Sequence, residues 1–375
     1  MNFLEYRGKQ MLAAAGIPIP TGIHCLTAED AAQAAAELGP CAIKAQVPAG
    51  KRGKAGGVKL VATADEARVA AESILKLKIG GYRVESLLVE RKVSVKREFY
   101  AAVMNDLTAR CPLLLFSLSG GMDIEELAAN SPEAIVHIPV DIEQPLTSKD
   151  VLESLKELAV EPPLRHAIAD FLTKLYAVFM EKDAELLEIN PLGLLEDGSL
   201  LAMDCKLTLD GSSAYRQQDM AAQHAPEPRT ELELAGEQIG LKYIELPGEV
   251  GVLANGAGLT MTTMDVISHF GGQPSNFLEI GGDAYTKAEP ALNLVLSNPK
   301  VKSLVINFCG AFARTDVMTE GILRAWETLK PKIPVFFSVH GTGEDEAVAL
   351  LRARLGITPY NHMEDAVSAA VEASK

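Results

Sequence analysis

The hydrophobic and polar positions of this chain follow two different patterns, one on each side of residues 218–247. Before this segment, helical and strand patterns alternate irregularly, with helices expected near residues 3–15 and 27–38, the second starting with a Thr-x-x-Asp capping pattern. After it, short apolar runs alternate regularly with helical stretches. The apolar runs lie near residues 249–254, 276–280, 302–307, 333–339 and 355–358. Short continuous runs of this kind are typical of parallel strands covered on both faces.

The change of pattern predicts an α/β chain with two domains, as expected for 375 residues. We expect the first domain to cover residues 1–225 and the second to cover residues 248–375. The second domain should be a flavodoxin-like, doubly wound parallel sheet. Residues 226–247 are expected to be a linker, because two prolines and a charged stretch interrupt the rhythm there.

The most informative stretch is a hairpin formed by residues 187–192 and 203–206, which we expect to be two strands joined by an Asp-Gly turn. Side chains two apart share a face of a strand, so Glu188 should lie beside Asn190, and Asp204 beside Lys206. Amide and carboxylate oxygens suit Mg²⁺ that carries nucleotide phosphates. An ordinary hairpin with one polar face is the alternative.

A second candidate is the loop of residues 50–57, which holds four glycines and three cations between two strands. Glycines let backbone N–H groups approach an anion, and the cations neutralise it. Neither the Walker nor the dinucleotide-binding pattern is present. Lys44 precedes the loop on the incoming strand, where it could reach a phosphate. Glu90 ends a later strand and could bind adenine or ribose. A flexible basic hairpin and a surface charge are the alternatives for the loop and for Glu90.

Composition narrows the class of protein further. The formal net charge of −15 argues against nucleic acid or an anionic membrane as the main partner. The five cysteines are scattered without metal-ligand spacing, which favours a reducing compartment. No apolar run approaches the ~18 residues of a membrane span. The first residues have an early acid and no apolar signal core. We therefore expect a cytoplasmic protein.

Taken together, the motifs resemble the ATP-grasp half of the succinate–CoA ligase β subunit. The resemblance continues through the second domain, so it spans essentially the whole chain in order. The stretches that carry it are residues 2–9, Lys44 with 50–57, Glu90 with Glu98, 188–191 with Asp204, 255–259, 277–282, and Arg314 with Asp316.

The resemblance implies an N-terminal ATP-grasp domain with a smaller subdomain near residues 21–97. Residues implied to contact the ATP phosphates are Lys44, Lys51, Arg52 and Gly53. Those implied to line the nucleoside cleft are Glu90, Val93 (through its backbone) and Glu98. Asn190 and Asp204 would hold Mg²⁺, and Glu188 would face a phosphorylated histidine. Pro20 matches the family members that prefer ATP over GTP.

Phosphate in this family passes from ATP to a histidine on a separate α subunit, then to the acid, and CoA displaces it. None of the seven histidines here lies in the Gly-His-Ala-Gly-like loop of that subunit, and His340 is the only candidate near a strand end. The resemblance implies a tricarboxylic-acid-cycle type of ligase, and the histidines imply that this chain is one subunit of it. The ligase would be an αβ or α2β2 assembly in which the α subunit supplies the phosphohistidine and most of the CoA site.

The sequence departs from the family where a carboxylic acid is expected to bind. The glycine-rich loops there suit an anion, and the residues assigned to it are Asn255, Ala311, Phe312 and Ala313. The family usually reads Phe-Gly-Gly-Ile-Val/Asn-Arg at residues 309–314, and Arg-x-Glu-Gly where this chain has Ser338-Val339-His340-Gly341. Pro48 replaces a usual histidine. The acid could be succinate, malate or another small acid. A non-catalytic nucleotide-binding subunit is the third possibility.

Overall fold

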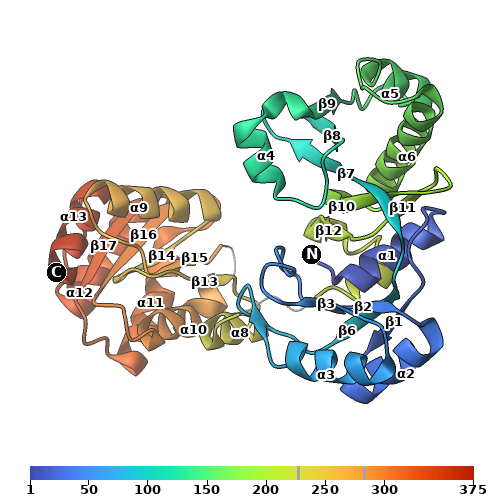
Figure 1. The fold of residues 1–375 in the computed structure, drawn as a ribbon. Helices are drawn as coiled ribbons and strands as arrows, with labels where there is room; N and C mark the ends of the chain where they lie inside the picture. The colour runs from blue at the N-terminus through green and yellow to red at the C-terminus, as the bar shows by residue number, and fades with distance from the viewer. Residues whose placement is uncertain (226–228, 282–283) are drawn as a thin grey trace. The chain divides into compact units, whose positions relative to one another are not determined.

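The computed structural model describes residues 1–225, 229–281 and 284–375. The chain divides into two compact units, Met1–Pro228 and Arg229–Lys375. Figure 1 shows the first unit from blue to yellow-green and the second from yellow to red. Within the described residues, no helix combines the length and apolar character that a membrane span requires.

The first unit contains a small antiparallel sheet with two helices on one face (Figure 1). Its strands, in spatial order, are β1 (Gly22–Cys25), β6 (Leu87–Arg91), β2 (Cys41–Ala45) and β3 (Val58–Val61). The helices are α2 (Ala28–Leu38) and α3 (Ala64–Ile74). The expected capping of α2 is present, because Thr27 and Asp30 exchange side-chain to backbone hydrogen bonds. Alanines on both helices allow close packing in the core beneath the sheet.

A larger antiparallel sheet forms the rest of the first unit. Its strand order is β11 (Leu200–Ala202), β10 (Ala184–Leu195), β7 (Val95–Asp106), β8 (Cys111–Ser117) and β9 (Ile135–Pro139), with β12 (Lys206–Leu209) also on β10. The core beside it contains side chains of α1 (Glu5–Ala14), α5 (Ser148–Ser154) and α6 (Pro162–Glu181). The shorter elements are α4 (Ile124–Asn130), α7 (Gln218–Ala221), β4 (Lys78–Ile79) and β5 (Tyr82–Arg83).

The hairpin predicted around residues 196–199 is present, but its second arm is interrupted. Leu192 to Leu194 of β10 pair with Ala202 to Leu200 of β11, and Glu188 pairs with Lys206 of β12. Residues 203–205 lie between the two strands rather than in one. The expectation that Asp204 shares a strand face with Lys206 is therefore wrong. The Met203 carbonyl explains the break, since it accepts from the Lys9 and Lys44 ammonium groups at 2.8 and 2.6 Å.

The second unit is a parallel sheet with helices on both faces, as predicted. The hydrogen-bonded order is β14 (Val250–Ala254), β16 (Ser303–Gly310) and β17 (Val335–Gly341). Strand β15 (Asn276–Leu278) lies beside β14, where its flanking residues form parallel bridges. Tyr360 forms a parallel bridge to Ser338 at the other edge. The resulting 2-1-3-4-5 order is that of a flavodoxin-like fold.

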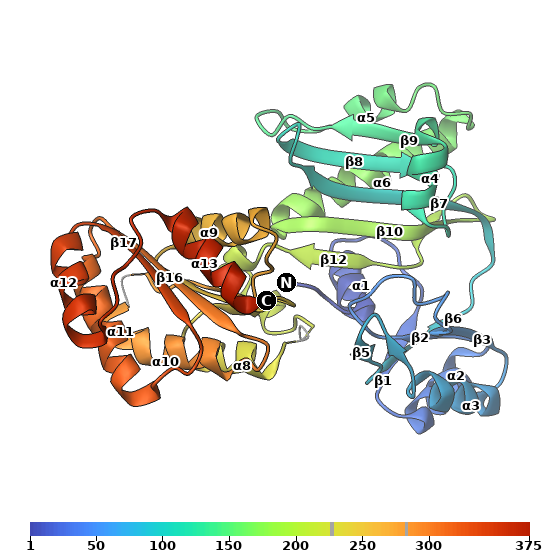
Figure 2. The same ribbon diagram turned by 90° about the vertical axis from the view of Figure 1, so that its left-hand side faces the viewer.

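Alternate residues along these strands face different helices. Val250, Val252 and Val305 pack with α9 (Ala257–His269) and α13 (Met363–Ser374). Leu304, Ile306 and Phe308 contribute to the core on the opposite face, and Figure 2 shows helices on both faces of the sheet. The helices there are α10 (Ala284–Ser297), α11 (Thr315–Leu329) and α12 (Glu344–Leu355). Both faces are thus buried, which explains why the strands are continuous apolar runs.

Two expectations about this unit are corrected. The strand expected at residues 355–358 is reduced to the isolated bridge at Tyr360, because Pro359 has no N–H for a ladder. Within the expected linker, residues 229–247 form α8 (Glu231–Gln238) and β13 (Tyr243–Glu245), and β13 pairs with β15. Helix α8 begins with a capping box from Thr230 to Glu233. This is a sequence signal for a helix, although the prolines before it favour a linker. Residues 226–228 of that linker lie outside the described residues.

Candidate functional site

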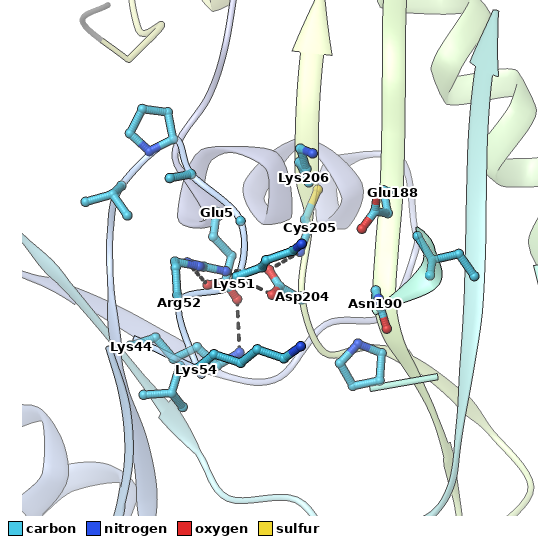
Figure 3. A pocket seen from close by; sticks show the side chains of 18 of the residues that line it. Glu5, Lys44, Lys51, Arg52, Lys54, Glu188, Asn190, Asp204, Cys205 and Lys206 are labelled. Carbon is cyan, nitrogen blue, oxygen red and sulfur yellow. Dashed lines mark hydrogen bonds and ion pairs between the residues drawn. The ribbon is translucent and has the colours of Figure 1, made fainter. Parts of the chain in front are cut away.

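A cavity of about 390 Å³ in the first unit collects most of the residues expected to bind ATP and metal. Five separate segments contribute to it: residues 2–5, β2 with the loop that follows, β10, the link between β11 and β12 with the start of β12, and residues 121–125. The expected site residues in its wall are Lys44, Lys51, Arg52, Gly53, Glu188, Asn190 and Asp204 (Figure 3). The fold thus brings together residues from Asn2 to Leu207 of the sequence.

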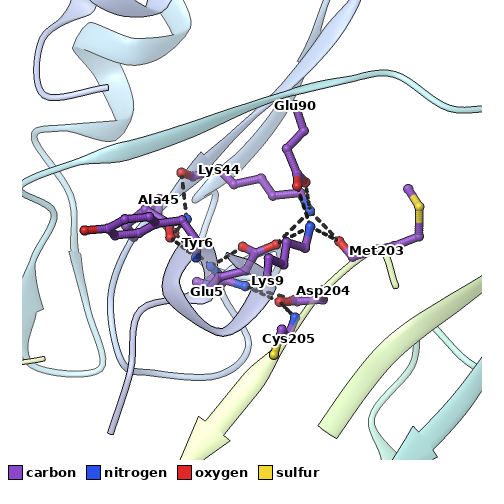
Figure 4. Close-up of polar contacts among 11 residues, drawn as sticks. Glu5, Tyr6, Lys9, Lys44, Ala45, Glu90, Met203, Asp204 and Cys205 are labelled. Atoms are coloured by element: carbon purple, nitrogen blue, oxygen red, sulfur yellow. Dashed lines mark hydrogen bonds and ion pairs between the residues drawn. The ribbon is translucent and has the colours of Figure 1, made fainter. Parts of the chain in front are cut away.

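Three residues expected in the nucleoside cleft lie outside the wall of this cavity. Glu90 is buried on β6, where its carboxylate accepts from Lys9 at 2.5 Å and forms an ion pair with Lys44 at 2.6 Å (Figure 4). The alternative that Glu90 is a surface charge is wrong. Val93 is half-buried, and Glu98 is exposed on β7 with its carboxylate against Gly121. Their expected contacts with the nucleoside stay predictions.

A largely buried ionic cluster forms part of the cavity wall, and Glu5 is its centre (Figure 4). The Glu5 carboxylate forms ion pairs with Lys9 at 2.9 Å, Lys44 at 3.0 Å and Arg52 at 2.6 Å, and Glu5 is only 2% exposed. Burial opposes ionisation of Glu5, but the three cations outweigh it and hold the pKa well below its ordinary value. Glu5 is therefore a carboxylate at neutral pH.

The cations of the cluster are held in their charged form by the same contacts. Burial lowers the pKa of Lys44 and of Arg52, but neighbouring carboxylates raise both well above their ordinary values. Three cations (Lys9, Lys44, Arg52) meet three carboxylates (Glu5, Glu90, Asp204), so their formal charges cancel. Such a balanced cluster can keep permanent positive charge at the floor of a cavity.

Arg52 connects this buried cluster to the open part of the cavity. One end of its guanidinium binds Glu5 and the Ala45 carbonyl, while Nη2 donates to both oxygens of Asp204 at 2.7 and 2.9 Å. Asp204 is about one third exposed, so its carboxylate remains accessible from the cavity. A two-point contact of this kind fixes the direction in which both groups point.

Asn190 and Glu188 lie on the opposite wall, on β10 (Figure 3). The Asn190 amide oxygen accepts from the Gly121 N–H at 2.8 Å, and its nitrogen donates to the Met122 carbonyl at 2.9 Å. Glu188 is half-buried, and burial raises its pKa above the ordinary value although Lys206 opposes the shift. The pKa of Tyr100 is raised as well, by burial and by the charge of Glu188.

The oxygen donors of this cavity fit magnesium by their chemistry. Mg²⁺ typically takes one or two carboxylates together with substrate phosphates and keeps several waters. Asp204 and Asn190 offer a carboxylate and an amide oxygen on neighbouring segments of the wall, since the Met203 N–H donates to the Pro191 carbonyl. Among the described residues, no group of three or more His, Cys, Asp or Glu side chains forms a closed metal site. The set therefore suits a metal that arrives with the nucleotide.

Two important residues were missed at the level of individual side chains. Glu5 and Lys9 lie within the stretch of residues 2–9 that carries the family resemblance, and the sequence alone indicates no role for either. Their spacing of four on a helix allows them to pair on one face, but this pattern is common on exposed helices. Only the fold reveals that both are buried, with exposed fractions of 2%.

The residues expected to bind the acid lie at the C-terminal edge of the parallel sheet in the second unit. The Asn255 side chain joins two strand ends, since it donates to the Cys309 carbonyl at 2.9 Å and accepts from the Cys309 N–H at 2.7 Å. Beyond Cys309, Ala311 is exposed, Ala313 is half-buried and Phe312 is fully exposed. This edge is where doubly wound sheets bind ligands, but acid binding here stays a prediction.

His340 lies at the same edge, next to Cys309 in the register of β16 and β17. Its Nδ1 is 3.4 Å from Glu344, and the Gly341 N–H donates to that carboxylate at 3.0 Å. The Thr342 carbonyl accepts from the Thr315 N–H and hydroxyl, which ties the loop after β17 to the start of α11. These hydrogen bonds hold together the strand ends and loops at the C-terminal edge of the parallel sheet, which we call the rim.

Comparison with known proteins agrees with this division of the chain. The family model described as an ATP-grasp domain matches residues 2–194, and the one described as CoA-ligase matches residues 253–371. The fold and the site thus define an ATP-grasp subunit of a CoA ligase. The chain belongs to the family of succinate–CoA ligase β subunits.

Individual relatives support this family assignment along the whole chain. The succinate–CoA ligase [ADP-forming] subunit beta of Chloroflexus aurantiacus is 40% identical over 378 residues, covering 100% of this chain and 99% of the relative. The [GDP-forming] subunit beta of Thermus thermophilus is 40% identical over 358 residues, covering 94% of each. ATP citrate lyase from Methanothrix soehngenii shares the fold, with a TM-score of 0.75, 24% identity and 99% of each chain covered.

The ionic cluster predicts a large loss of stability when its centre is neutralised. Glu5→Gln leaves three buried cations against two carboxylates, so we expect the free energy of unfolding to fall by about 3–5 kcal/mol. Urea unfolding measures this loss. Glu37→Gln, which changes an exposed residue of α2, is the matched control and should have little effect.

A double variant distinguishes charge imbalance from lost packing. Glu5→Gln combined with Lys9→Met restores the balance of charge and should recover part of the stability. No recovery in the double variant, or a loss no larger than that of Glu37→Gln, would contradict the role assigned to the cluster.

Proposed function

We propose that this chain binds Mg²⁺–ATP in the cavity of its first unit, as the β subunit of an ADP-forming acid–CoA ligase. The phosphoryl group passes from ATP to a histidine of a partner α subunit and then to a carboxylic acid. CoA displaces phosphate from the acyl phosphate, so that acid, ATP and CoA become acyl-CoA, ADP and phosphate. The observation that carries the proposal is the single cavity that gathers permanent cations and metal-type oxygen donors.

The charge distribution of the cavity suits phosphoryl transfer. This reaction depends mainly on positioning and on neutralising the phosphate oxygens. Lys44 and Arg52 are held charged by buried carboxylates, so they offer oriented positive charge without a proton equilibrium. Asp204 and Asn190 would hold Mg²⁺, which when bound would neutralise the charge of the phosphates. The half-buried Glu188, with its raised pKa, would accept a hydrogen bond from the incoming imidazole.

The need for a partner follows from the histidines. None of the seven histidines, all of which lie in the described residues, contributes to the wall of the cavity. Three of them, His137, His166 and His224, have Nδ1 within hydrogen-bond distance of a nearby backbone carbonyl. A histidine from another chain is therefore the simplest phosphoryl acceptor. We propose that it belongs to an α subunit, in an αβ or α2β2 assembly, which also supplies most of the CoA site.

Succinate is the acid that the family assignment favours, and malate is the main competitor. Ala311 and the exposed Phe312 alter the shape of the rim and leave the two hydrogen bonds between Asn255 and Cys309 in place. A purely non-catalytic role is disfavoured because the nucleotide cavity keeps all its charged groups. We propose ATP rather than GTP on the strength of Pro20, although the relatives include both kinds of subunit.

The partner requirement predicts that this chain alone forms no acyl-CoA. We expect ATP-, acid- and CoA-dependent thioester formation only after an α-like subunit is added, because the phosphorylated histidine comes from that subunit. Thioester absorbance measures the reaction, and radioactive ATP should label the partner and not this chain. Full activity of the isolated chain would overturn the division of the enzyme.

The metal assignment predicts that Asp204→Asn lowers the Mg²⁺-dependent rate of ADP formation by about 100-fold or more in the reconstituted pair. Asparagine keeps the size of the side chain but removes the charge that would hold the metal. Asp219→Asn, an exposed change on α7, is the control. Turnover near the normal rate in Asp204→Asn would remove Asp204 from the metal site.

The altered rim predicts a change of acid preference when the usual family residues are restored. In a panel of small carboxylic acids, we expect Ala311→Gly combined with Phe312→Ile to raise kcat/KM for succinate relative to bulkier acids by about tenfold. The KM for ATP should stay unchanged, since the nucleotide cavity lies in the other unit. An unchanged acid profile would exclude this loop as the selecting element.

A further inference from the structure

The segment between β8 and the start of α4 forms ion pairs with cations of the loop of residues 50–57, which is expected to bind the nucleotide phosphates. The Lys51 ammonium is 2.9 Å from the Asp123 carboxylate and 3.5 Å from that of Glu125. Lys54 lies 3.6 Å from the same oxygen of Asp123. All four residues line the cavity, and the two lysines extend into it in Figure 3. The phosphate-binding loop is therefore already paired with anions of its own chain.

The same segment also forms hydrogen bonds with the side-chain amide of Asn190, which is expected to hold the metal. Gly121 donates its N–H to the Asn190 oxygen at 2.8 Å, and Met122 accepts from the Asn190 nitrogen at 2.9 Å. One short segment, residues 121–125, thus satisfies both the loop cations and Asn190. The two sets of contacts come from opposite walls of the cavity, since Lys51 follows β2 and Asn190 lies on β10.

The Asp123 carboxylate is engaged mainly by the two lysines of the loop. Asp123 occupies the N-cap position of α4, yet its side chain makes no capping hydrogen bond. Only 13% of the side chain is exposed, because it is turned toward the lysines. The contact with Lys51 lowers the pKa of Asp123 below its ordinary value, so the carboxylate stays charged. Lys51 meets it from a left-handed backbone conformation, with φ of 62°, which a lysine rarely adopts.

We propose that Asp123 is an internal substitute for the nucleotide phosphates, which the polyphosphate chain must displace from Lys51 and Lys54. The inference rests on the proposed nucleotide site. A polyphosphate carries several negative charges and can replace both lysine contacts at once, whereas a single weak anion cannot. Asp123 therefore acts as a gate that selects polyphosphate ligands and lowers their apparent affinity, because its contacts must be broken first.

The experiment removes only the charge of the gate. Asp123→Asn keeps the size of the side chain and remains a favourable N-cap, so the fold should be retained. We expect the Kd for Mg²⁺–ATP, measured by calorimetry, to fall by about three- to fivefold, the range that exposed ion pairs allow. Inorganic tripolyphosphate should bind more tightly by a similar factor, because the gate acts on phosphate and not on the nucleoside.

A matched control separates the gate from a general change of net charge. Glu126→Gln removes one charge from the same helix at an exposed residue that forms no ion pair within the described residues. Its Kd for both ligands should stay at the wild-type value. Equal effects of the two variants, or an unchanged or higher Kd in Asp123→Asn, would overturn the proposal.

The two ligands also separate this proposal from the assignment of the nucleotide. A wild-type chain that binds tripolyphosphate but not Mg²⁺–ATP would contradict the proposed function, while the comparison of variants with tripolyphosphate would still test the gate. A wild-type chain that binds both ligands, with no gain in Asp123→Asn, would contradict only the gate. Binding of neither ligand by either chain would contradict both.

Discussion

The contact on which the first unit depends is the buried carboxylate of Glu5 among three cations. It joins α1 to β2 and to the loop of residues 50–57, and Lys9 and Lys44 extend the cluster to β6. Burying ions is costly, so such a cluster stabilises a fold only when every charge is paired. Here the pairing forces the small sheet and the link after β11 into one arrangement.

The cluster explains how the cavity keeps positive charge ready for phosphate. Lys44 and Arg52 are anchored at one end by Glu5, so they do not need a ligand to fix their positions. Fixed charges cost little reorganisation when a negative group arrives, which is the main source of electrostatic catalysis. The loop lysines differ, because Lys51 is 61% exposed and meets its carboxylate partners across the cavity mouth. The cavity therefore combines cations that are fixed by Glu5 with a loop lysine whose ion pairs a ligand can displace.

Sequence patterns predicted what is local or periodic. The parallel sheet followed from continuous apolar runs, the start of α2 from its capping box, and the hairpin from its Asp-Gly turn. The gathering of Lys44, Arg52, Asn190 and Asp204 could be expected only through the family resemblance. The depth of Glu5 and Glu90 could not be read from the chain, since burial of a charge depends on partners far away in sequence. The break at Met203 has the same origin.

The rim of the second unit shows why a change of residue there need not destroy function. Backbone and Asn255 hydrogen bonds hold the ends of β14, β16 and β17 in register, and none of them involves the side chains of Ala311 or Phe312. The frame that would present backbone N–H groups to a carboxylate is thus independent of the substituted positions. A fully exposed phenyl ring changes what can fit beside that frame, and exposed aromatic rings are favoured where another surface covers them. On the proposed assignment of this edge to the acid, the substitutions would therefore bear on which acid or partner surface is accepted, while the chemistry of the nucleotide cavity would be left as the ionic cluster sets it.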